Sequence, residues 1–103
     1  MAAKMRRSSG NVFRDLGYGP EEAEHLRIRS MLMAVLTRQI EARDVTQAEA
    51  AKLFGVSQPR VSDLVRGKVD LFSIDMLVDM LARAGMKVEF TAKPTSKRRP
   101  RVA

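Results

Sequence analysis

Residues 46–67, TQAEAAKLFGVSQPRVSDLVRG, constrain the fold more than any other segment because they carry the start and stop signals of two short helices. Thr46 is a favoured helix N-cap, and Glu49 three residues later completes a capping box. Gly55 stands where the first helix must end, in a position that favours left-handed backbone. Ser57 then caps a second helix. The segment therefore predicts two short helices joined by a tight turn.

Apolar residues recur at helical spacing in both helices, so each helix has one face for a core. In the first helix and the turn these residues are Ala50, Ala51, Leu53, Phe54 and Val56, and in the second they are Val61, Leu64 and Val65. The side chains left to face outward on the second helix are Ser57, Gln58, Arg60, Ser62 and Asp63. This pattern is typical of a helix-turn-helix DNA-binding unit. A helical hairpin that only packs against its neighbours is the alternative.

The outward side chains have the chemistry for contacts with DNA. Gln58 can contact N6 and N7 of adenine, and Arg60 can contact O6 and N7 of guanine or a phosphate. Gln47 lies at the start of the first helix, where the helix dipole favours a phosphate contact. A phosphate would repel Asp63, so this residue is expected to accept from cytosine N4, to pair with an arginine or to stay off the DNA.

The net charge of +7 points to nucleic acid less strongly than it first suggests, because most of it lies in the two ends of the chain. Residues 1–10 carry +3 and residues 93–103 carry +5, which leaves −1 for residues 11–92. Residues 46–68 carry +2, enough for a modest number of phosphate contacts. The two ends are expected either to be solvated, disordered tails or to bind phosphates as well.

The rest of the chain is mostly helical in pattern, which predicts an all-α fold of four to five helices. Residues 11–19, NVFRDLGYG, are expected to form a packed turn or a short helical piece. A long helix is expected from Pro20 to about Ala42, with apolar residues on more than one face. Ser73 is expected to cap a further helix, which ends at Gly85.

Residues 86–91, MKVEFT, alternate apolar and polar side chains, which predicts a β-strand. No other segment of the chain offers a partner strand, so we expect pairing with another chain, most simply with the same strand of a second copy. Met86, Val88 and Phe90 are then the dimerisation residues. A frayed extension is the alternative.

Other functional classes find no support in the sequence. There is no cysteine, and His25 is the only histidine, so we expect no metal site and no cofactor. No catalytic constellation is present, so we do not expect an enzyme. No apolar run approaches the length of a membrane span and no signal-peptide core is present, so we expect a cytoplasmic protein.

These motifs resemble the Xre/Cro-like helix-turn-helix family, whose lambda-repressor-like domain is the expected architecture. The general match is QAEAAKLFGVSQPRVSDLVRGK, residues 47–68. NVFRDLG at 11–17, the long helix after Pro20 and GMKVEF at 85–90 add a narrower similarity to HigA-type antitoxins and related regulators encoded beside RelE-like toxins. The similarity covers residues 11–91.

The resemblance implies a homodimeric repressor that binds a palindromic operator. It implies a DNA surface formed by Gln47, Ser57, Gln58, Arg60 and Ser62, with Lys68 near a phosphate; Asp63 and Arg66 complete our set of candidate DNA-binding residues. Pro59 stands where many relatives have a base-reading side chain, so readout is expected to depend more on Gln58 and Arg60. The basic C-terminal tail departs from the family pattern.

The sequence thus predicts a disordered basic tail at 1–10, a helix-turn-helix domain at 11–92 and a disordered basic tail at 93–103. We expect a DNA-binding repressor that is also the antitoxin of a RelE/HigB-like toxin. The alternative is a stand-alone phage-type or architectural regulator with no toxin partner.

Overall fold

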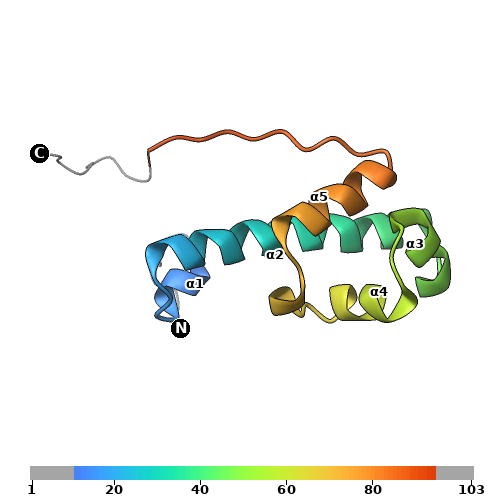
Figure 1. Ribbon diagram of the computed structural model, residues 1–103, viewed down its shortest axis with the longest axis horizontal. Helices are drawn as coiled ribbons and strands as arrows, with labels where there is room; N and C mark the ends of the chain where they lie inside the picture. Colours follow the sequence, from blue (N-terminus) through green and yellow to red (C-terminus); the bar gives the residue numbers. More distant parts are fainter. Residues whose placement is uncertain (1–10, 95–103) are drawn as a thin grey trace, which may run out of the picture.

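The computed structural model of the chain describes residues 11–94, and this part contains five α-helices and one short 3₁₀ helix. They are α1 (Val12–Asp15), α2 (Pro20–Arg43), α3 (Gln47–Phe54), α4 (Gln58–Val65), η1 (Val69–Leu71) and α5 (Ile74–Arg83). The long helix α2 runs through the molecule: α3, α4 and α5 gather beside its C-terminal half, and α1 lies at its N-terminal end (Figure 1). The expected all-α helix-turn-helix fold is confirmed.

The predicted helix starts are formed by side-chain caps. Thr46 Oγ1 accepts from the Glu49 backbone N–H at 3.1 Å, and Glu49 Oε1 accepts from the Thr46 N–H at 2.8 Å, which completes the capping box. Ser57 Oγ accepts from the Arg60 N–H at 3.3 Å, and Ser73 Oγ accepts from the Met76 N–H at 3.1 Å. Each cap satisfies a backbone donor that the helix itself leaves unpaired.

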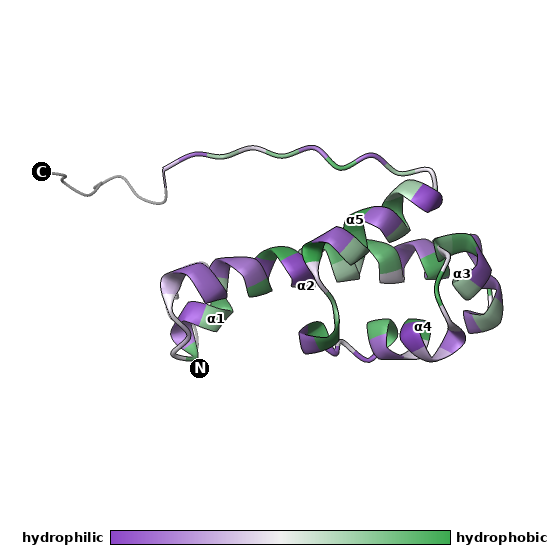
Figure 2. Ribbon diagram, in the orientation of Figure 1, coloured by the Kyte–Doolittle hydropathy of each residue, from purple (hydrophilic) through white to green (hydrophobic). Residues whose placement is uncertain are grey.

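One hydrophobic core joins α2, α3, α4, η1 and α5, and apolar residues line the facing sides of these helices (Figure 2). Its largest fully buried side chains are Phe54, Leu36, Leu64, Leu77, Met80, Leu81 and Val61. Phe72, in the loop after η1, is also buried. Val65, expected to face inward, is 38% exposed instead because α4 turns it away from this core.

The N-terminal end of α2 lies outside this core and is covered by α1. Asn11 caps α1 by accepting from the Phe13 N–H at 2.9 Å, and its side-chain N–H donates to the Ala23 carbonyl at 3.1 Å. Ala23 and Leu26 are buried there. The expected short helical piece is confirmed, but its packing leaves apolar side chains exposed: Val12, Leu16, Tyr18 and, on α2, Met31.

The predicted β-strand at 86–91 does not form in this chain, since residues 11–94 contain no strand. Residues 86–94, here called the C-terminal arm, run in an extended conformation back along α2 (Figure 1). Met86 and Val88 pack against the core, which accounts for the alternating pattern. A ladder also needs a second strand, and the described part of the chain supplies none.

The basic tail expected at 1–10 lies outside the described residues, as does nearly all of the tail expected at 93–103. Within residues 11–94, no helix combines the length and the apolar character that a membrane span requires.

Candidate nucleic-acid interface

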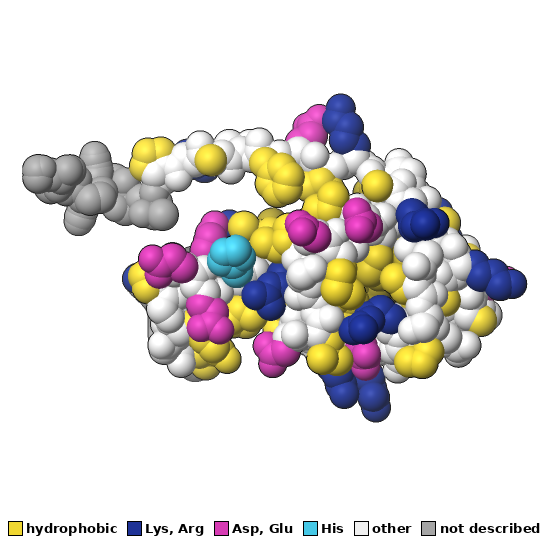
Figure 3. All heavy atoms as spheres, in the orientation of Figure 1, with side chains coloured by type: hydrophobic (Ala, Val, Ile, Leu, Met, Phe, Trp, Pro, Cys, Tyr) yellow, Lys and Arg dark blue, Asp and Glu magenta, His cyan; other side chains and the backbone are white. Residues whose placement is uncertain are grey.

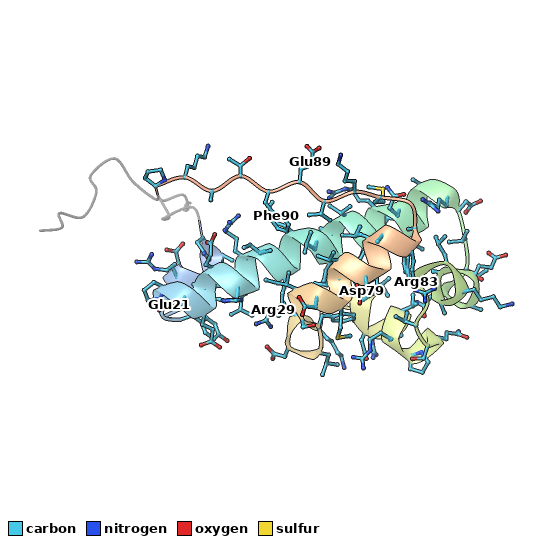
Figure 4. All side chains as sticks on the ribbon, turned by 45° about the horizontal axis from the view of Figure 1, so that its top comes forward. Glu21, Arg29, Asp79, Arg83, Glu89 and Phe90 are labelled. Atoms are coloured by element: carbon cyan, nitrogen blue, oxygen red, sulfur yellow. The ribbon has the colours of Figure 1, made fainter. Side chains whose placement is uncertain are left out.

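The turn between α3 and α4 is fixed both by its own backbone and by α5. Gly55 ends α3 with φ 73°, and the Val56 N–H donates to the Ala51 carbonyl at 3.0 Å. Arg83 of α5 lies against the turn, because a Cβ added at Gly55 would come within 2.5 Å of Arg83 Cδ. Figure 4 labels Arg83 near the C-terminal end of α5. The Arg83 side chain therefore packs against this turn.

Of the residues predicted to face outward on α4, the structure exposes those at the start of the helix. Ser57 and Gln58 are exposed at the helix start, while Ser62 and Asp63 are half-buried along its side. Val61 and Leu64 on the other face are buried in the core. The polar start of α4 thus projects from a helix whose opposite side is held by packing.

The other candidate residues lie on either side of this face. Gln47 is the first residue of α3 and is half-buried. Arg66 and Lys68 follow α4 and are exposed, and the Lys68 N–H donates to the Asp63 carbonyl at 3.1 Å. The candidates thus lie on α4, in the turn after it and at the start of α3.

Arg60 does not simply point outward from α4 as predicted. Its guanidinium carbon lies 5.5 Å from the centre of the Phe72 ring, a cation–π distance. Its Nη1 donates to the Leu71 carbonyl at 3.0 Å. Arg60 therefore ties α4 to the residues that follow η1, and its side chain is engaged within the protein. No pattern in the sequence predicts this contact, because Phe72 lies 12 positions further along the chain.

A family model described as a helix-turn-helix domain matches residues 12–93, most of the chain. The chain belongs to this helix-turn-helix family. No curated protein matches it. The match includes α1, the start of α2 and nearly all of the C-terminal arm, so these flanking elements belong to the family domain as much as the helix-turn-helix does. Domains of this class bind DNA and typically have no catalytic role.

In this helix-turn-helix domain, α4 occupies the place of the recognition helix, the second helix of the motif. Lysine and arginine side chains project from the edge of the molecule beneath α4 in Figure 3. Exposed basic residues close to a polar recognition helix are the arrangement that phosphate contacts require, since they attract the backbone without distinguishing its sequence.

Proposed function

We propose that the protein is a sequence-specific transcriptional repressor that binds a palindromic operator as a homodimer. The observation that carries this proposal is the exposed, polar start of α4, Ser57 and Gln58, on a helix whose other face is fixed in the core of a helix-turn-helix domain. A rigid helix with polar residues at its N-terminal end is suited to the major groove.

Within this proposal the candidate residues have separate roles. Gln58 contacts a base edge directly, and Arg60 does so only after exchanging its contacts with Phe72 and Leu71 for the DNA. Asp63 accepts from cytosine N4 or stays off the DNA. The remaining residues position the phosphate backbone: Gln47, Ser57, Ser62, Arg66 and Lys68.

The homodimer would form through the C-terminal arm, with Met86, Val88 and Phe90 as its contacts. The support is the extended conformation of the arm and the 70% exposure of Phe90. A two-fold dimer presents two recognition helices to half-sites about one helical turn apart, which matches a palindrome.

The finer proposal is that this repressor is also an antitoxin for a RelE/HigB-like toxin. The exposed apolar side chains of α1 and the start of α2 favour it, because they extend beyond what the DNA-binding core needs. Purification of the chain from its native cells after nuclease treatment tests it. A small basic protein recovered in fixed ratio supports the antitoxin, and recovery of the chain alone supports a stand-alone regulator.

The DNA-binding proposal is tested by selecting bound duplexes from a random pool and then comparing two variants. We expect a palindrome, and Gln58→Ala should weaken operator binding by about 1–3 kcal/mol while leaving binding to random DNA nearly unchanged. The matched control is Lys68→Ala. It should weaken binding to the operator and to random DNA equally, and reduce the slope of log affinity against log salt concentration by about one. If the chain bound all duplexes in the pool equally well, the proposal would be wrong.

A further inference from the structure

The C-terminal arm has a free backbone edge and two faces that differ in polarity. Among the described residues, its last backbone N–H with a partner is that of Met86, which donates to the Leu81 carbonyl at 2.9 Å; none from residue 87 onward forms a backbone hydrogen bond. Figure 4 shows Phe90 directed toward α2 and Glu89 directed away from it. The arm is therefore a strand in conformation that lacks only a partner.

Charges on the outer face of the arm carry information about that partner. Lys87 Nζ lies 3.6 Å from Glu89 Oε2, so both side chains project from the same face, and they are 82% and 80% exposed. Met86 and Val88 on the other face are half-buried. Since this arm has one positive and one negative residue flanking Val88, it is complementary to an antiparallel copy of itself.

We infer that two copies of the chain pair their arms as an antiparallel two-stranded ribbon whose two-fold axis passes through Val88, so that Lys87 lies opposite Glu89 of the second copy. In this register both cross-strand charge pairs are attractive. Met86 lies opposite Phe90 of the second copy, and the two Val88 side chains face each other on the inner side. The inference rests on the homodimer proposed above and specifies its register.

The neighbouring registers fail on charge or on face. A two-fold axis at Lys87 or at Glu89 places two like charges opposite each other, which is destabilising. An axis between residues 88 and 89 places the half-buried Val88 opposite the exposed Glu89, which mixes the apolar and polar faces. The register at Val88 keeps both faces intact and pairs every charge of residues 86–90 with its opposite.

A charge exchange on the full chain, without DNA, tests the register by sedimentation equilibrium at low salt. Lys87→Glu alone, and Glu89→Lys alone, should each raise the dimer dissociation constant about tenfold, because two symmetric pairs become repulsive. The double variant should return to within about threefold of the original chain. Both residues are too exposed for the changes to perturb the fold. A double variant no stronger than the single ones overturns the inference.

A cysteine pair measures the same register independently, since the chain has no native cysteine. Val88→Cys should oxidise to a disulfide dimer, because directly opposite positions have Cα atoms about 4.5–5.5 Å apart. Glu89→Cys should not, because its two copies lie on a diagonal of about 7–8 Å.

Cross-linking at 89 in preference to 88, or a chain that is monomeric at every concentration, overturns the inference. Operator selection is measured separately, so the DNA-binding proposal can stand when the register fails, and a correct register can stand when no operator is found.

Discussion

The helix-turn-helix half of the molecule and its flanks differ in how far their apolar side chains are buried and their backbone groups are hydrogen-bonded within one chain. In α3, α4 and α5 each helix start is capped, and the apolar faces are buried with side chains such as Leu64 and Leu77 at 1% and 0% exposure. In the flanks, α1 leaves Leu16 70% exposed, and the C-terminal arm leaves Phe90 equally exposed with an unpaired backbone. One copy of the chain completes the first half but not the second.

This difference separates two tasks. A recognition helix must be held rigidly before DNA arrives, because ordering a loosely held helix on binding costs free energy and so lowers the affinity. A surface for another protein chain must stay accessible until that chain arrives, and its apolar residues are exposed in the meantime. Under the proposed dimer, a partner chain would cover part of the flanks, whereas the core is already buried within one copy.

The largest expected effect comes from a matched pair of leucines. Leu36→Ala should lower the free energy of unfolding by about 2–5 kcal/mol, because Leu36 is fully buried and a cavity would remain. Leu16→Ala should change it by less than about 0.5 kcal/mol. Urea unfolding of each variant, followed by helical circular dichroism at one protein concentration, measures both. If the two losses were equal, the flank would be as buried in solution as the core.

A second pair compares two glycines with the same φ of 73°, Gly55 in the turn and Gly67 after α4. Gly67→Ala should cost about 1 kcal/mol, because only the left-handed backbone opposes it and nothing lies within 4 Å. Gly55→Ala should cost slightly more, by less than about 0.5 kcal/mol, since only the flexible end of the Arg83 side chain must also move away. In an Arg83→Ala background the two alanine variants should become equal in urea unfolding. A difference that persists there would show that Arg83 does not hold the turn.

The smallest effect tests the contact that joins α4 to η1. Arg60→Ala should lower the free energy of unfolding by about 1 kcal/mol, through loss of the Phe72 and Leu71 contacts. Arg66→Ala removes the same charge from an exposed site and should cost less than about 0.5 kcal/mol.

Hydrogen exchange at the backbone amides of residues 71–73 should speed up in Arg60→Ala alone. A greater loss on operator than on random DNA in the same variant would indicate that Arg60 also reaches a base. If neither stability nor exchange changed, the contact with Phe72 would be incidental.

Much of the fold was predictable because its signals act over three or four residues. The Thr46–Glu49 box, the Ser57 and Ser73 caps and the glycine ending α3 were all read correctly from the sequence. The exposed polar start of α4, Ser57 and Gln58, was predictable for the same reason, since side-chain spacing on a helix decides which residues face away from the core. Whether those residues contact DNA stays a prediction.

The errors and omissions all concern contacts between distant parts of the chain. The strand expected at 86–91 is absent from the single chain, because alternation predicts an extended amphipathic segment, whereas a strand also needs a partner backbone. The exposure of Val65 depends on how α4 is rotated against α2, which no local pattern determines.

The sequence by itself determined where α2, α3, α4 and α5 begin, which residues form most of their apolar faces and that the chain carries a helix-turn-helix, but it did not predict η1. Only the tertiary structure decided that Arg60 is held by Phe72, that Arg83 lies against Gly55 and that the C-terminal arm follows α2 without a partner strand in residues 11–94. Caps and periodicity depend on residues within a few positions along the chain. These contacts join residues that lie at least 12 and in one case more than 40 positions apart, and only the packed core brings them together.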